Sequence, residues 1–161
     1  ITPHNYEVYS IELVRMLLAA GSEVDVVAKL LCRSVAPSAP AENINDYRSI
    51  LVRSYPHLPG IKVAMPRHGV ELAPWDAWTT GNNPEWWRSY NSVKHHRDTH
   101  YYEASLINAI RTASGLCVLV AYLYHDFLES TVIRKPLLFL ADEYKTDGKI
   151  LFGVNYKMPD F

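Results

Sequence analysis

The first part of the chain carries apolar residues at helical spacing. A helix is predicted over residues 8–20, where apolar positions recur every three or four residues, and Gly21 is expected to end it. Ser22 would then cap a second helix that has two carboxylates in its first turn. The apolar side of this second helix consists of Val24, Val27, Ala28, Leu31 and Cys32. A third helix is predicted around residues 47–51 and ends before Pro56.

Residues 58–80 depart from the helical pattern. Two short extended segments, residues 61–65 and 70–72, flank Pro66–Gly69, which is predicted to be a turn. An irregular stretch rich in Pro, Gly and Asn follows and contains Trp75 and Trp78. We expect residues 58–80 to form an insertion, part irregular and part β, on the surface of a helical bundle.

A strong start signal for a further helix lies just beyond this insertion. Asn83 is a favourable N-cap residue and Pro84 suits the first helical position, so a helix is predicted to run to about Asp98. The longest helix is predicted from about Tyr101 to Glu129, either continuous with the previous one or separated from it by a kink. Its apolar middle, Leu116–Leu123, is expected to be largely buried against the other helices or a second subunit.

The end of the chain carries a hairpin signal. The Asp147–Gly148 pair favours a tight turn, so a β-hairpin is predicted within residues 136–156, with apolar segments at 137–140 and 150–152. The fold class that follows is mainly α, a helical bundle with one or two small β-hairpin additions. At 161 residues, the chain is expected to form one domain over residues 1–161.

Composition limits the classes of partner. With 16 Lys and Arg against 17 Asp and Glu, the chain has no overall attraction to nucleic acid or anionic membrane, so any RNA contact must come from a local basic cluster. The longest apolar stretch, residues 112–124, is shorter than the ~20 residues of a membrane span, so no membrane contact is expected. Cys32 and Cys117 lie in apolar runs, which predicts buried thiols in a reducing, cytoplasmic compartment. The first residues also lack the pattern of a secretory signal.

The segment with the clearest chemical potential is residues 86–100. Arg88 and His95 are seven residues apart, which on a helix places them nearly in line and ~10 Å apart along the axis. Asn91 falls near the same line, and Lys94 adds positive charge beside it. The opposite side carries Trp86, Tyr90 and Val93. The sequence therefore predicts a helix with an aromatic side that anchors it in the core and a polar side directed elsewhere.

This polar side contains the side chains that metal-independent RNA cleavage requires. An imidazole exchanges protons near neutral pH, and a guanidinium can bind a phosphate and stabilise its transition-state charge. Together they could activate the 2′-hydroxyl next to the scissile phosphate. One helix provides only half of such a cleft, and a two-fold dimer would provide the other half. A plain solvent-facing surface is the simpler alternative for the same pattern.

The run Trp86–Arg97 resembles the signature of HEPN domains, in which an arginine and a polar residue precede a histidine. Here Ser89 follows Arg88, and six residues separate Arg88 from His95. Residues 21–29 resemble the acidic helix of this family, and the long apolar helix after His95 also fits it. The resemblance therefore covers most of the helical part of the chain.

The resemblance implies an antiparallel helical bundle that forms a homodimer and acts as a ribonuclease in a toxin or antiviral defence system. It implies that Arg88 is the phosphate clamp and His95 the general acid/base. It further implies that Asn91 and Lys94 are auxiliary residues and that Glu23 is a partner holding Arg88. No cofactor is expected.

Three alternatives remain open at this point. His96 and His100 could share a face and bind a metal ion, but Arg97 stands where a metalloprotease motif has glutamate, and we favour no metal. The four tryptophans could form a stacking surface for bases, although core packing is the favoured interpretation. Finally, the domain could be a non-catalytic dimeric module that binds a protein or RNA partner.

Overall fold

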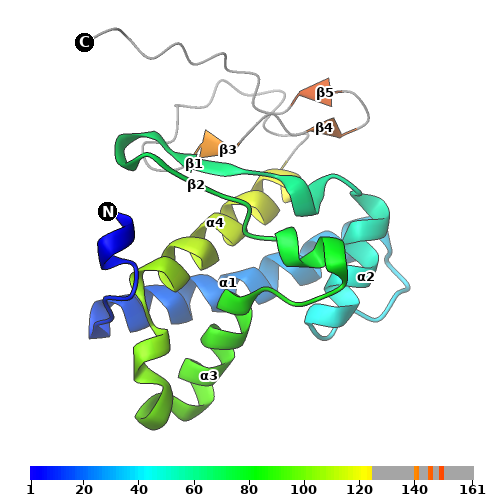
Figure 1. The fold of residues 1–161 in the computed structure, drawn as a ribbon. Helices are drawn as coiled ribbons and strands as arrows, with labels where there is room; N and C mark the ends of the chain where they lie inside the picture. The colour runs from blue at the N-terminus through cyan, green and yellow to red at the C-terminus, as the bar shows by residue number, and fades with distance from the viewer. Residues whose placement is uncertain (125–139, 142–144, 147–148, 151–161) are drawn as a thin grey trace, which may run out of the picture.

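The computed structural model describes residues 1–124, 140–141, 145–146 and 149–150. Four α-helices dominate this part of the chain (Figure 1): α1 Ile11–Val35, α2 Ile44–Ser54, α3 Glu85–His100 and α4 Leu106–Leu123. Five short 3-10 helices and five short strands accompany them within the described residues. The predicted fold class, mainly α with small β additions, is confirmed.

Helix α1 is one continuous helix, so the prediction that Gly21 separates two helices is wrong. Ser10 caps its start, because the Ser10 hydroxyl accepts a hydrogen bond from the Leu13 amide at 3.2 Å. Gly21 lies in the buried side of α1, and a β-carbon at this position would overlap the ring of Tyr90 in α3. The glycine therefore allows a close approach between two helices, and Ser22 is an interior residue rather than a cap.

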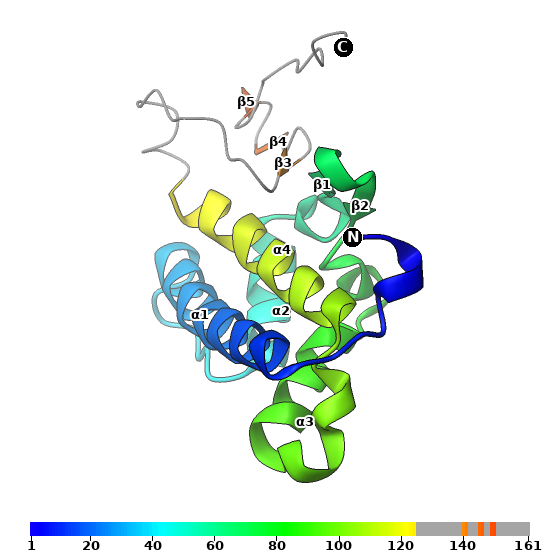
Figure 2. The same ribbon diagram turned by 90° about the vertical axis from the view of Figure 1, so that its left-hand side faces the viewer.

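Helices α1 and α4 pack along each other and form the centre of the core (Figure 2). Leu17, Val24 and Leu31 of α1 and Val118 and Leu119 of α4 are almost fully buried. By length and composition α4 is the one described helix that could cross a membrane, and 56% of it is buried inside the fold. Between Leu116 and Leu123 every position is buried or half-buried, and the half-buried Leu116, Val120 and Leu123 pack against the core, so the prediction that this segment is largely buried is confirmed.

The boundary between α3 and α4 differs from the prediction. The backbone of His96 is non-helical, with φ −139° and ψ 44°, and a 3-10 helix, η5 Tyr101–Glu103, follows the end of α3. Helix α4 begins only at Leu106, where the Ser105 hydroxyl accepts a hydrogen bond from the Asn108 amide. It ends at Leu123, so α1 with 25 residues is longer than α4 with 18. Of the predicted helix, residues 125–129 lie outside the described residues.

The β additions are small and partly as predicted. Strands β1 Val63–Met65 and β2 Val70–Leu72 pair antiparallel around η3 Pro66–His68, and Gly69 has a φ of +61°, so the predicted turn is confirmed. Strand β3 Leu140–Ala141 joins the other edge of β1. Strands β4 Lys145–Thr146 and β5 Lys149–Ile150 form the hairpin predicted near the end of the chain. The turn residues 147–148 and residues 151–156 lie outside the described part.

The prediction that residues 58–80 form only a surface insertion is wrong, because its tryptophans enter the core. Trp75 is fully buried, and its ring centroid lies 5.0 Å from that of Trp86 in an edge-to-face arrangement. The Trp75 Nε1 donates a hydrogen bond to the Gly115 carbonyl at 3.1 Å, and the Trp86 Nε1 donates one to the Pro74 carbonyl at 2.7 Å. All four tryptophans are buried, which confirms the core-packing interpretation.

Candidate functional site

The start of α3 is held against α2. The predicted N-cap, Asn83, does not cap the helix, since the residue preceding the first helical residue is Pro84 and no side-chain cap forms there. The Asn83 side chain instead accepts a hydrogen bond from Arg48 at 2.9 Å and donates one to Asn45 at 3.1 Å. These side-chain bonds fix where α3 begins, and the tryptophan cluster fixes how it is rotated.

The buried side of α3 is the predicted aromatic side. Trp86, Tyr90 and Val93 are at most 4% exposed, which confirms that they anchor the helix. The buried sector is wider than predicted, because Trp87 and Ser89 are buried as well. Ser89, the polar residue that follows Arg88, therefore does not belong to the solvent-facing side.

Arg88 and His95 both lie on the exposed side of α3. The Arg88 side chain is 72% exposed, and His95 is exposed at the end of the regular part of the helix, directly before His96. Since the backbone distortion begins only at His96, the seven-residue spacing retains its helical geometry and leaves both groups on one line, ~10 Å apart. The structure thus places the two predicted catalytic side chains on a common surface.

The predicted auxiliary residues are already in local contacts. The Asn91 amide nitrogen donates a hydrogen bond to the Trp87 carbonyl at 2.8 Å, and Asn91 is half-buried. The Lys94 ammonium lies 5.4 Å from the centre of the Tyr90 ring, which is within cation–π range. Lys94 is nonetheless exposed and adjacent to His95 in the sequence. The Asn91 side chain, in contrast, is bonded to the backbone of its own helix.

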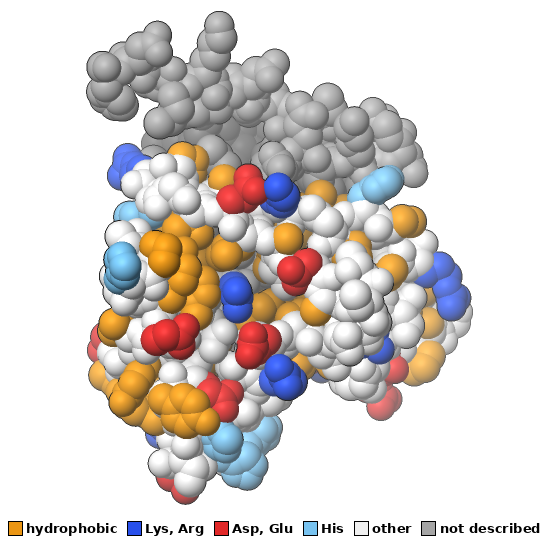
Figure 3. All heavy atoms as spheres, in the orientation of Figure 1, with side chains coloured by type: hydrophobic (Ala, Val, Ile, Leu, Met, Phe, Trp, Pro, Cys, Tyr) orange, Lys and Arg blue, Asp and Glu red, His pale blue; other side chains and the backbone are white. Residues whose placement is uncertain are grey.

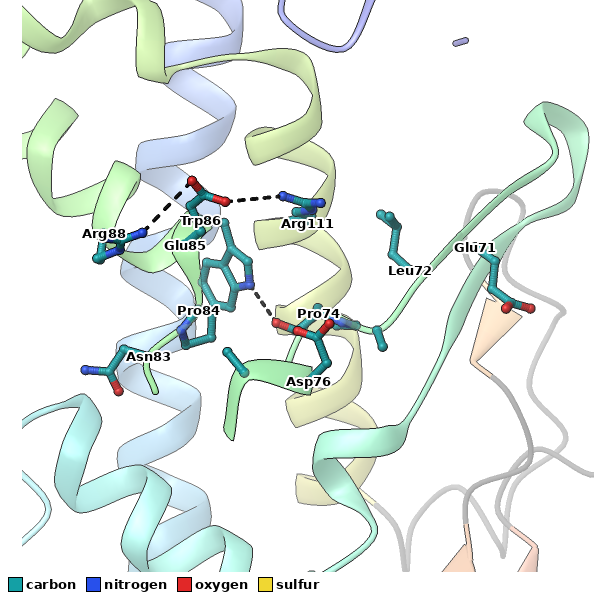
Figure 4. A pocket seen from close by; sticks show the side chains of 12 residues that line it. Glu71, Leu72, Pro74, Asp76, Asn83, Pro84, Glu85, Trp86, Arg88 and Arg111 are labelled. Atoms are coloured by element: carbon teal, nitrogen blue, oxygen red, sulfur yellow. Dashed lines mark hydrogen bonds and ion pairs between the residues drawn. The ribbon is translucent and has the colours of Figure 1, made fainter. Parts of the chain in front are cut away.

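The expected pairing of Glu23 with Arg88 is not formed. Arg88 Nη2 lies 4.0 Å from Glu85 Oε1, one turn earlier on the same helix, and the other oxygen of Glu85 lies 4.0 Å from Arg111 Nη1 on α4 (Figure 4). Glu23 is an exposed residue of α1. Glu85 therefore takes the part that the family resemblance implied for Glu23. Its position three residues before Arg88 was visible in the sequence, whereas the approach of Arg111 was not.

Two hollows meet at Arg88 and Glu85. The first, of about 470 Å³, lies between the start of α3, α4 and the segment after β2, and it also contains Arg111 and the carboxylates of Glu71 and Asp76 (Figure 4). The second, of about 450 Å³, contains the carboxylates of Glu7 and Glu103. His95 lines neither hollow. In each hollow carboxylates outnumber arginines, so neither one attracts a phosphate by charge alone.

Histidines gather at the end of α3, seen as the pale blue group at the lower end of the molecule in Figure 3. His95 and His96 have ring centroids 6.4 Å apart, and His96 and His100 have theirs 6.2 Å apart. His100 Nδ1 is 2.6 Å from Glu103 Oε1. In the part of the chain that the structure describes, no group of three or more His, Cys, Asp or Glu side chains has the arrangement of a metal site.

The cysteines are poor candidates for a nucleophile. Burial, with a smaller effect of Asp46, raises the pKa of the Cys32 thiol to about 11. Burial also raises the pKa of Cys117. Both thiols are therefore protonated at neutral pH, and a thiol attacks only as its thiolate. Neither cysteine is an alternative to the Arg88–His95 surface.

Comparison with family models, with curated proteins and with solved structures finds no match to this chain. An exposed guanidinium and an exposed imidazole on one rigid, well-anchored helix can bind a phosphate and exchange a proton with a ligand that reaches both.

Proposed function

We propose that this chain is a HEPN-like endoribonuclease that cuts RNA without a metal ion. The observation that carries the proposal is the exposure of Arg88 and His95 along one side of α3, opposite the buried aromatic side. Arg88 is the phosphate clamp and His95 the general acid/base that serves the 2′-hydroxyl. By family resemblance, we extend the proposal to a cytoplasmic role in toxin or antiviral defence.

The proposed active cleft is formed by two copies of the chain. Arg88 and His95 lie ~10 Å apart along one exposed helix side, so a single copy presents them on an open surface and not in a closed cleft. A two-fold axis that brings two α3 helices together places the arginine of one copy near the histidine of the other. A homodimer is therefore part of the proposal.

The direct test is cleavage of mixed RNA by the purified full chain in EDTA. Arg88→Ala and His95→Ala are each expected to lower the cleavage rate at least ~100-fold. His96→Ala and Arg53→Ala, which change the same residue types elsewhere, are expected to retain cleavage. Cleavage that requires added metal, or that survives in both Arg88→Ala and His95→Ala, contradicts the proposal.

Mixing the two inactive variants tests the shared cleft. A mixed dimer of Arg88→Ala and His95→Ala contains one arginine and one histidine on different copies, so a trans-acting site regains part of its activity. A site built within one copy regains none. The mixing experiment therefore distinguishes a cleft shared by two copies from a cleft within one copy.

The second candidate is a non-catalytic module that binds a protein or RNA partner. It is favoured by the excess of carboxylates in both hollows beside Arg88, which disfavours a bound phosphate. If this candidate is correct, the wild-type chain leaves varied RNAs uncut while Arg88→Ala weakens capture of the partner.

A further inference from the structure

The outer side of α1 is unusually apolar for a surface. Of the eight large hydrophobic side chains that are exposed in the described part of the chain, six lie within residues 8–30: Val8, Tyr9, Ile11, Met16, Val26 and Leu30. Single exposed hydrophobic residues are normal, but a row of them on one helix marks a contact surface. This concentration is confined to the first helix and the residues that lead into it.

Five residues of α1 form an exposed line, here called the outer stripe: Met16, Ala19, Glu23, Val26 and Leu30. Their separations are three, four, three and four residues, which is the spacing of a helix–helix seam. Met16 is 51% exposed and Leu30 is 44% exposed. The opposite side of α1 packs into the core, so this helix has apolar residues on two sides, and the described residues cover only one of them.

We propose that the outer stripe packs antiparallel against the outer stripe of a second copy of this chain. The charges at the two ends of the stripe are the reason for this choice. The same spacing extends to Glu12 at one end and to Arg33 at the other, and both are exposed. An antiparallel pair places Glu12 of each copy opposite Arg33 of the other, whereas a parallel pair places like charges together.

The side chains along the stripe are also self-complementary in this arrangement. With Glu12 opposite Arg33, Met16 faces Leu30 and Ala19 faces Val26, so apolar groups meet along the seam. The two-fold axis passes beside Ser22 and Glu23, where the hydroxyl of one copy can donate to the carboxylate of the other. The two helices then meet over about 30 Å, given a rise of ~1.5 Å per residue.

This contact is separate from the proposed RNA-cleaving surface. Gly21, which faces Tyr90 of α3, and Glu23, at the centre of the stripe, are about 200° apart around α1. Pairing through α1 therefore leaves the Arg88–His95 side of α3 uncovered. Both contacts coexist only in an assembly larger than a dimer, and each proposal can fail without the other.

The first test is the mass of the full chain in solution by sedimentation velocity. The wild type is expected to form dimers through α1, or larger assemblies where the α3 contact forms as well. Met16→Glu with Leu30→Glu is expected to weaken the α1 contact on the order of 100-fold or more, as loss of central contacts does. Tyr124→Glu, at an equally exposed hydrophobic position directly after α4, is the matched control and is expected to leave the α1 contact intact. Unchanged circular dichroism and melting show that each variant folds. A monomeric wild type, or an assembly whose mass the double substitution leaves unchanged, overturns the proposal.

Charge reversal tests the antiparallel direction. Arg33→Glu is expected to weaken the dimer about tenfold, since two symmetric exposed pairs are lost and replaced by repulsion. Adding Glu12→Arg to Arg33→Glu is expected to restore wild-type dimerisation, because the two charges then exchange places. Failure of the double reversal to restore dimerisation overturns the proposed pairing of these two positions.

Cross-linking with a short bismaleimide tests which residues of the two outer stripes face each other. It also introduces no charged residue, so it does not depend on whether the glutamate variants fold. Glu23→Cys, beside the axis, is expected to link to its own counterpart. Leu30→Cys alone is expected to remain unlinked, while Met16→Cys with Leu30→Cys links. The wild type, whose Cys32 is buried and Cys117 half-buried, is the background control. Linking of Leu30→Cys alone indicates a parallel pair and overturns the antiparallel arrangement.

Discussion

The backbone of Gly21 in α1 lies directly against the ring of Tyr90 in α3. A β-carbon at residue 21 would be 2.6 Å from both Cγ and Cε2 of that ring, closer than carbon atoms approach in proteins. The contact fixes the aromatic side of α3 against the core, and it thereby leaves Arg88 and His95 on the opposite, solvent-facing side.

Gly21→Ala is expected to destabilise the fold, although alanine favours helix formation by about 1 kcal/mol over glycine. The added methyl group must displace the Tyr90 ring, and overpacking of this kind costs ~1–3 kcal/mol, so the net effect is a lower urea midpoint. Gly60→Ala is the control, since nothing lies within 4 Å of a β-carbon there. In combination with Tyr90→Ala the Gly21→Ala cost is expected to fall. A Gly21→Ala variant as stable as the wild type contradicts this contact.

Tyr47→Phe is expected to cost ~1.5–3 kcal/mol of unfolding free energy, the usual contribution of a hydrogen bond to a charged group. The fully buried Tyr47 ring directs its hydroxyl to Asp25 Oδ1 at 2.7 Å and so joins α2 to α1. Tyr102→Phe, which removes the hydroxyl of a tyrosine that is 58% exposed, is the control. Chemical denaturation measures both, and an equal loss in the two variants argues against a special role of the Asp25 bond.

Stability is expected to fall between about pH 9 and pH 11 because of Cys32. Burial raises the pKa of this thiol from 9.0 to about 11 in the folded chain, so the unfolded chain releases the proton first. The protonated thiol contributes its full stabilisation of the folded chain below pH 9 and loses it as the pH approaches 11. The free energy of unfolding is expected to fall by an amount on the order of 1–3 kcal/mol over this range. Cys32→Ala removes this titration but leaves those of the tyrosines. Urea denaturation of the wild type and of Cys32→Ala measures the free energy of unfolding at each pH. The same dependence on pH in both proteins would exclude this effect.

The products of cleavage are expected to identify the proposed chemistry. Attack by the 2′-hydroxyl leaves a 2′,3′-cyclic phosphate. DNA, which lacks a 2′-hydroxyl, is expected to resist cleavage. His95→Ala is expected to lower the rate by ~10²–10⁴ with folding intact. Arg88→Lys should also impair cleavage, because it keeps the charge but loses the forked donor geometry. Mass spectrometry of the fragments provides the measurement, and 5′-phosphate products would point to a different nucleophile.

Glu85→Gln is expected to strengthen RNA binding several-fold and to make it more dependent on salt. The substitution removes the carboxylate that lies 4.0 Å from both Arg88 and Arg111 and frees two cations for phosphates. Glu42→Gln makes the same change in net charge at an exposed position outside both hollows and serves as the control. Fluorescence anisotropy at several salt concentrations measures the effect. An equal increase in RNA affinity in Glu85→Gln and Glu42→Gln would mean that the net charge, and not the position of Glu85, determines binding.

The sequence by itself determined the elements whose signals are local. The turn at Gly69 needs a residue that tolerates positive φ, and the period of apolar residues in α3 separates its aromatic side from Arg88 and His95 whatever packs against it. The burial of Trp86 likewise follows from its large apolar side chain on the aromatic side of α3. These features depend on neighbours within a few residues, so they can be read from the chain.

Only the tertiary structure decided the features that depend on distant partners. Gly21 continues a helix instead of ending one, because the space above it is filled by Tyr90 from another helix. The segment around Trp75 belongs to the core because its indole donates to the Gly115 carbonyl, 40 residues away. Arg111 reaches Glu85 only through the packing of α4 beside α3. Glycine, tryptophan and arginine each occur in several structural environments in proteins. Contact with a residue that is distant in the sequence determines which of these environments each one has here.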